Sequence, residues 1–127
     1  LTRALDEAVA ATRENMRLIL NLALNYGGRA EILDATRKVL NAHARGELDA
    51  AKLDDASFAS YLYTDGMPDP DLIIRSAGEY RTSNFMVWQA AHALFWVTPI
   101  HWPDFREEHL SQAIAAWRAS HQAESEE

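Results

Sequence analysis

Three short apolar runs, separated by longer amphipathic segments, restrict how this chain can fold more than any other feature. The runs occupy residues 16–24, 72–74 and 94–98, and they are rich in aliphatic, β-branched or aromatic side chains. Runs of this length bounded by turn formers are typical of buried strands and are too short to span a membrane. Because amphipathic segments lie between them, the sequence predicts an α/β fold with about three parallel strands and flanking helices.

Apolar residues that recur every three or four positions predict the helices of this fold. These helices cover residues 1–15, 30–44, 55–62 and 106–119, and a further helix is expected to begin at Ser83. The predicted buried face of the second helix consists of Ile32, Leu33, Thr36, Val39, Leu40 and His43. The predicted buried face of the helix after Ser83 consists of Phe85, Trp88, His92 and Phe95.

The remaining segments carry signals for caps, loops and termini. Asp55 and Asp104 precede helical patterns and are suitable N-cap residues. Residues 63–70 contain a glycine and two prolines, which predict a loop. The acidic tail of residues 120–127 is expected to fray.

Composition excludes several classes of protein. The chain has 19 acidic and 12 basic residues and a formal net charge of −7, which argues against a general nucleic-acid binder. It has no cysteine, which excludes disulfides and fits a cytoplasmic protein. No run of 18 apolar residues is present, so we expect no transmembrane segment. Any site for an anion must therefore be local.

The end of the predicted strand 72–74 carries the clearest candidate site. Arg75 follows this strand directly, and Arg81 and Ser83 lie in the loop that leads to the next predicted helix. Strand ends and helix starts are where open α/β sheets bind ligands, and arginine supplies forked donors for phosphate oxygens. The pattern indicates a diphosphate site, although arginines that are only solvated or salt-bridged fit the same pattern.

Several spaced motifs resemble the cis-prenyltransferase family, of which undecaprenyl diphosphate synthase is a member. Residues 74–85 (IRSAGEYRTSNF) are similar to the family's C-terminal signature, as are Trp88-Gln89 and residues 102–105 (WPDF). The upstream residues 25–29 (NYGGR) also match. The order and spacing of four motifs make the resemblance specific, and it covers nearly the whole chain.

The resemblance implies that residues 1–119 are the C-terminal half of a cis-prenyltransferase domain, followed by the acidic tail. Family members condense isopentenyl diphosphate with an allylic diphosphate to give a Z-polyprenyl diphosphate, and they form homodimers. An aspartate motif in the family's N-terminal half has no counterpart in this chain, so we expect the chain alone to be inactive. Any contact with a membrane would come through the lipid product.

The resemblance also assigns roles to individual residues. The family positions that match Arg75, Arg81 and Ser83 bind the diphosphate of isopentenyl diphosphate, and Thr82 between them would add a backbone contact. Glu79 is expected to orient the two arginines through salt bridges. The supporting residues of the upstream loop are Asn25, Gly27, Gly28 and Arg29.

The family's magnesium site is altered in this sequence. Where the family has a metal-binding glutamate, this chain has Leu94, which offers no oxygen ligand. We therefore expect Mg²⁺ in the whole family enzyme but no metal ligand from this chain. Two alternatives stay open, a non-catalytic family member that assists a partner subunit and a stand-alone diphosphate-binding module.

Overall fold

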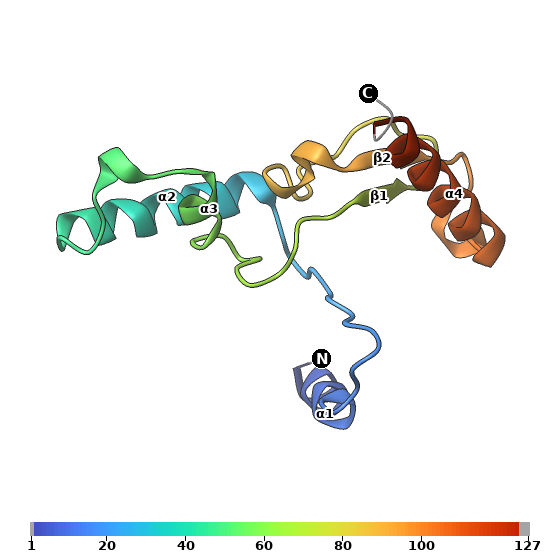
Figure 1. Ribbon diagram of the computed structural model, residues 1–127. Coiled ribbons are helices and arrows are strands. Elements are labelled where there is room, and N and C mark those ends of the chain that lie inside the picture. The colour runs from blue at the N-terminus through green and yellow to red at the C-terminus, as the bar shows by residue number, and fades with distance from the viewer. Residues whose placement is uncertain (1, 125–127) are drawn as a thin grey trace.

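The computed structural model describes residues 2–124 (Figure 1). Its four α-helices are α1 (Thr2–Thr12), α2 (Gly28–Ala44), α3 (Asp55–Ala59) and α4 (Glu107–Glu124). Its strands are β1 (Leu72–Arg75) and β2 (Leu94–Val97), and three short 3-10 turns are η1 (Ala50–Lys52), η2 (Gln89–His92) and η3 (Trp102–Asp104). No helix among residues 2–124 combines the length and the apolar character needed to cross a membrane.

The two strands form a parallel sheet, with helices beside it. In the register, Leu72 lies opposite Leu94 and Arg75 lies opposite Val97. Helix α4 contacts both strands, as Figure 1 shows at the right of the molecule, while α2 and α3 lie at the left, apart from the sheet. The prediction of an α/β fold with a parallel sheet and flanking helices is confirmed. Both strands lie where the sequence placed them.

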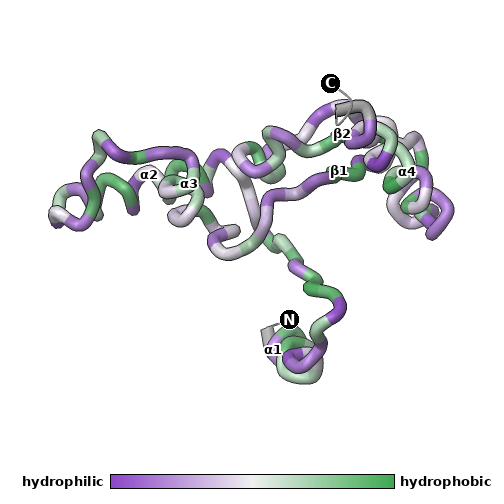
Figure 2. The backbone as a smooth tube through the Cα atoms, viewed as in Figure 1, coloured by the Kyte–Doolittle hydropathy of each residue, from purple (hydrophilic) through white to green (hydrophobic). Residues whose placement is uncertain are grey.

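The third predicted strand, residues 16–24, is not a strand in the structure. This segment is extended and leads away from the body of the molecule to α1 (Figure 1), and Figure 2 shows its hydrophobic residues interrupted by hydrophilic ones. Met16 is 93% exposed and Ile19 is 89% exposed. A run of apolar residues without alternation is typical of a strand buried on both faces, and that requires neighbouring strands. Within the described residues no strand lies beside it, so the segment remains unpaired.

The helix predicted to begin at Ser83 is also not formed. Ser83, Asn84 and Met86 have φ angles of 49°, 66° and 46°, in the left-handed region, and right-handed helices cannot start there. Only the short turn η2 forms before β2 begins. The predicted buried face is only partly buried, because the Trp88 ring lies 4.6 Å from that of Phe58, whereas Phe85 is 41% exposed and His92 is also exposed.

The helix caps differ from the predicted ones by a few residues. Asp54 rather than Asp55 caps α3, and it forms a capping box with Ser57. Asp104 lies within η3, and at the start of α4 the Arg106 amide donates to His109 Nδ1 at 2.9 Å. A cap depends on which backbone N–H groups are left unpaired, and two adjacent aspartates compete for that place.

Helix α4 is longer than predicted and runs to Glu124. Residues 120–124 of the predicted frayed tail are therefore helical, and residues 125–127 lie outside the described part of the chain. Because Ala, Gln and Glu all have good helix propensity, the last turns continue although they are polar.

The buried face of α2 is rotated from the predicted one. Leu33 and Leu40 were expected to be buried, but they are 57% and 61% exposed. Residues that are buried on α2 include Gly28, Glu31, Ala35, Val39 and Ala42. Small residues at this spacing let other segments approach closely, and hydrogen bonds offset the burial of the one carboxyl group. The apolar pattern alone could not reveal this face.

Candidate diphosphate-binding site

Arg75 occupies the last position of β1, and its side chain turns toward the loop that follows. One guanidinium nitrogen, Nη2, donates to Glu79 Oε2 and also to Ser83 Oγ at 3.2 Å. Strand β1 thus fixes the base of the side chain, while the loop holds its end. The structure brings Arg75 and Ser83 together, as the diphosphate-site prediction requires.

Arg81 pairs with the same carboxylate. Its Nη2 donates to Glu79 Oε1 at 2.8 Å, and its Nε lies 3.3 Å from Glu79 Oε2. The expected salt bridges of Glu79 are therefore present. Arg81 and Arg75 lower the pKa of the Glu79 carboxyl, and Glu79 in turn raises the pKa of Arg81. Two cations and one anion leave this group with an excess of positive charge.

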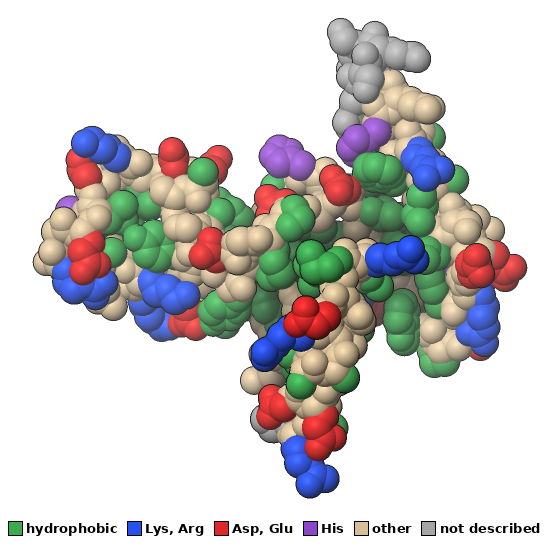
Figure 3. Space-filling model, turned by 60° about the horizontal axis from the view of Figure 1, so that its bottom comes forward, with side chains coloured by type: hydrophobic (Ala, Val, Ile, Leu, Met, Phe, Trp, Pro, Cys, Tyr) green, Lys and Arg blue, Asp and Glu red, His purple; other side chains and the backbone are tan. Residues whose placement is uncertain are grey.

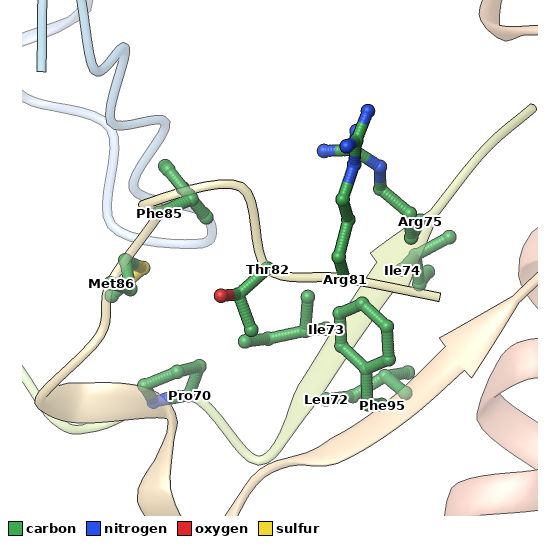
Figure 4. Close-up of a pocket in the computed structure, with 10 residues that line it drawn as sticks. All are labelled: Pro70, Leu72, Ile73, Ile74, Arg75, Arg81, Thr82, Phe85, Met86 and Phe95. Atoms are coloured by element: carbon green, nitrogen blue, oxygen red, sulfur yellow. The ribbon is translucent and has the colours of Figure 1, made fainter. Parts of the chain in front are cut away.

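The two arginines stand at the rim of a small pocket (Figure 4). In this view both guanidinium groups extend to the same region, while Ile73 and Phe95 lie beside the strands and Thr82 lies on the loop. The pocket is lined by Pro70, Leu72, Ile73, Ile74, Arg75, Arg81, Thr82, Phe85, Met86 and Phe95. It therefore joins a cationic end to an apolar end, a combination that suits an anion attached to a short hydrocarbon.

The upstream loop contacts the candidate site through backbone groups. Asn84 accepts hydrogen bonds from the Gly28 amide at its main-chain oxygen (2.8 Å) and from the Arg29 amide at its Oδ1 (2.9 Å). Gly27 lies directly against the Asn84 side chain. That this loop supports the site stays a prediction, and the hydrogen bonds described above for the arginine cluster do not involve Asn25.

Sequence reasoning missed a buried carboxyl group next to this loop. Glu31 is 0% exposed and accepts hydrogen bonds from the Tyr26 hydroxyl (2.5 Å) and the Tyr63 amide (2.8 Å). The Gln89 side-chain amide donates to both of its oxygens. Burial raises the pKa of the Tyr26 hydroxyl, and the hydrogen bond to Glu31 raises it further. The sequence feature that could have indicated its burial is the spacing of the small residues Gly28, Ala35 and Ala42, which lie on the same face of α2 as Glu31.

The described residues do not fit a magnesium site. Leu94 lies in β2 opposite Leu72, and both side chains are aliphatic. Among residues 2–124, no three His, Cys, Asp or Glu side chains cluster as metal ligands would. Magnesium requires oxygen ligands, and Glu79 near the pocket is already paired with two arginines.

A basic surface is also absent from the face drawn in Figure 3. Among the described side chains on this face, Lys and Arg lie between Asp and Glu rather than in one continuous patch. The two arginines of the pocket are thus a local feature of an acidic chain, as the composition indicated.

A parallel sheet with Arg75 at a strand end and Arg81 in the following loop, both lining a largely apolar pocket, is an arrangement that suits an organic anion. Comparison with known proteins identifies the family. Residues 1–124 match the family described as "Putative undecaprenyl diphosphate synthase", and the chain belongs to this prenyltransferase family.

Named relatives agree with this assignment. An isoprenyl transferase of Heliobacterium mobile is 47% identical over 116 residues, which cover 91% of this chain and 45% of the relative. An isoprenyl transferase of Bacillus subtilis (strain 168) is 44% identical over 116 residues, with the same coverage of both chains.

A solved structure is also similar to this chain. It is the crystal structure of lavandulyl diphosphate synthase from Lavandula x intermedia in complex with dimethylallyl diphosphate, with a TM-score of 0.85 and 39% sequence identity. The similarity covers 92% of this chain and 50% of that one. This chain therefore spans about half the length of the relatives that it matches.

Proposed function

We propose that this chain supplies the isopentenyl diphosphate-binding part of a cis-prenyltransferase. The observation that carries the proposal is the convergence of Arg75 and Arg81 on one carboxylate beside the Ser83 hydroxyl, at the rim of an apolar-lined pocket. Forked guanidinium donors and a hydroxyl match the oxygens of a diphosphate. The apolar lining matches a five-carbon hydrocarbon. The lavandulyl diphosphate synthase relative was solved with dimethylallyl diphosphate, a ligand of this size and class.

In the proposed reaction, the bound isopentenyl group is the nucleophile. Its terminal double-bond carbon forms a bond to the allylic carbon, the allylic carbon–oxygen bond breaks, diphosphate leaves, and a proton is lost from the isopentenyl unit. Arg75, Arg81 and Ser83 hold the isopentenyl diphosphate in place, and Thr82 adds a contact in the pocket wall. Holding two reactants in a productive geometry removes much of the entropic part of the barrier.

The allylic diphosphate site and the magnesium site are not assigned to the described residues. We propose that residues 1–119 form the C-terminal half of the domain and that the allylic diphosphate binds mainly to another part of the whole protein. We assign magnesium to that part too, because Leu94 stands in this chain where the family has a metal-binding glutamate and offers no oxygen ligand. A homodimer in the cytoplasm is the arrangement we expect for the whole protein.

One observation favours a second candidate function. The aliphatic side chain of Leu94 stands where the family has a metal-binding glutamate. A family member that keeps a diphosphate pocket but lacks this ligand would fit a non-catalytic subunit that assists an active partner. The two functions make different predictions. Under the first, the whole protein forms product by itself, and under the second it does so only with a second subunit.

Titration calorimetry with isopentenyl diphosphate tests the proposal. Arg75→Ala and Arg81→Ala should each weaken binding by about 1.5–3 kcal/mol, roughly ten- to a hundredfold, because each removes a charge-assisted contact. Omitting magnesium should leave the affinity unchanged. The matched control is Arg45→Ala, because Arg45 also pairs with a glutamate two residues away, Glu47, but on the far end of α2. Equal affinities for all three variants and the parent protein would refute the proposal.

A further inference from the structure

The loop that carries Arg81 and Ser83 has a backbone that its own sequence does not favour. Ser83, Asn84 and Met86 all lie in the left-handed region, with φ of 49°, 66° and 46°. Non-glycine residues in this region raise the energy of the backbone and persist only where surrounding contacts hold them. Asparagine tolerates the conformation better than serine or methionine. The contacts that hold this loop are therefore informative.

Helix α2 provides those contacts through the backbone amides of its first turn, which have no partner within the helix. Its N-cap residue, Gly27, has no side chain to accept hydrogen bonds from the first turn. Asn84 takes this role from 55 residues away, because its Oδ1 accepts from the Arg29 amide at 2.9 Å. Its main-chain oxygen accepts from the Gly28 amide at 2.8 Å. Two of the unpaired donors that every helix start presents are thus satisfied by the loop.

The close approach of loop and helix depends on the paired glycines. A β-carbon at Gly27 would lie 2.9 Å from Asn84 Nδ2. A β-carbon at Gly28 would lie 2.9 Å from Val87 Cγ2 and 3.0 Å from the Val87 amide nitrogen. Separations this short are repulsive, so any larger residue would push the loop away from the helix. The glycines serve this contact rather than a phosphate cradle.

We propose that Asn84 is a positioning residue for the diphosphate site, acting as the remote N-cap of α2. It stands next to Ser83, whose hydroxyl contacts Arg75, and three residues after Arg81. By anchoring the loop on a helix end, Asn84 fixes where these donors stand relative to the end of β1. The inference rests on the proposed function, since positioning matters only if Arg75 and Arg81 bind a diphosphate.

Four variants of the whole protein test the steps of this inference one at a time. Asn84→Gly keeps the left-handed backbone and the main-chain acceptor but removes Oδ1, and Asn84→Ala also destabilises the backbone. Gly27→Ala leaves Asn84 in place and displaces its amide group. Asp54→Ala removes a similar exposed cap, that of α3, which lies outside the pocket. Each variant is first shown to be folded by circular dichroism.

The readouts are the Kd of isopentenyl diphosphate and the exchange rate of individual amide hydrogens. Asn84→Ala is expected to raise the Kd by roughly tenfold, and Asn84→Gly and Gly27→Ala by about threefold. In Asn84→Gly the Arg29 amide should lose protection from exchange while the Gly28 amide keeps it. Asp54→Ala should lower stability to a similar extent and leave the Kd unchanged.

The outcomes distinguish this inference from the proposed function. If Arg75→Ala and Arg81→Ala weaken binding but the Asn84 and Gly27 variants do not, the positioning role is overturned and the proposed function stands. If Asp54→Ala raises the Kd as much as Asn84→Ala does, the effect is one of general stability and the positioning role is again overturned. If the two arginine variants bind as tightly as the parent protein, the proposed function fails and the inference fails with it.

Discussion

The Gln89 side-chain amide donates to both carboxyl oxygens of Glu31, at 3.2 and 3.1 Å, although the two residues are 58 positions apart. Both side chains are buried, with 0% exposure for Glu31 and 2% for Gln89. The same carboxyl group also accepts from the Tyr63 amide. Glu31 therefore ties helix α2 to η2 and to the segment after α3. A buried carboxyl group whose hydrogen bonds reach three segments fixes their relative positions.

Replacing Glu31 with alanine should destabilise the protein by about 2–4 kcal/mol, because the part-buried Tyr63 amide loses its acceptor and the buried Gln89 amide keeps only the Thr64 hydroxyl. Urea unfolding followed by circular dichroism measures this change. Glu108→Ala is the control, because that side chain is 73% exposed and should change stability by no more than about 0.5 kcal/mol. Equal stabilities of the two variants would contradict the role of Glu31.

The Glu79 carboxyl should titrate below the ordinary glutamate pKa of 4.5, because Arg81 and Arg75 favour its ionised form. Carbon-13 NMR of the side-chain carboxyl measures the midpoint. Arg81→Ala should move the midpoint back toward the ordinary value, and Arg75→Ala should do so to a smaller extent. A midpoint that ignores both substitutions would mean that these ion pairs are not formed in solution.

The same shift fixes the sign of a stability effect. The folded-state pKa of Glu79 is lowered, so its ion pairs add stability at pH values above the ordinary glutamate pKa. That contribution is lost as the pH falls through the folded-state pKa. Glu79→Gln should therefore be less stable than the parent protein at pH 7, and the difference should disappear in strong acid. Unfolding curves of both proteins across this pH range measure it.

Gly28→Ala should destabilise the protein by about 1–3 kcal/mol, because the new methyl group would meet Val87 at 2.9 Å. Val87→Ala in the same protein removes Val87 Cγ2 and should recover part of the loss, which a double-mutant cycle measures by urea unfolding. The Val87 backbone still lies close to the new methyl, so recovery should be incomplete. Strictly additive effects of the two substitutions would refute the contact.

Backbone amides of residues 17–23 should exchange with solvent at close to their intrinsic rates in this chain alone, because the described structure gives them no strand partner. Amides of β1 and β2 should exchange much more slowly, since they pair with each other. Hydrogen exchange measured by NMR resolves the two groups. Strong protection of residues 17–23 would show that the segment is paired after all.

Local patterns predicted the parts of the fold that local forces decide. The strand before Arg75 and the strand after Ala93 were found from short apolar runs, because each run packs on a neighbouring strand in this chain. The same kind of run at residues 16–24 gave a wrong strand, because pairing depends on a partner that the run itself does not specify. The helix predicted at Ser83 failed because tertiary contacts overrode the aromatic spacing.

By itself, the sequence determined the arginine cluster, because Arg75, Glu79, Arg81 and Ser83 lie within nine residues and one turn of chain suffices to bring them together. It also determined the family, through motifs in a fixed order. Only the tertiary structure decided that Asn84 caps α2 and that Gln89 pairs with Glu31. Contacts across more than 50 residues depend on how whole elements pack, and no local spacing records that packing.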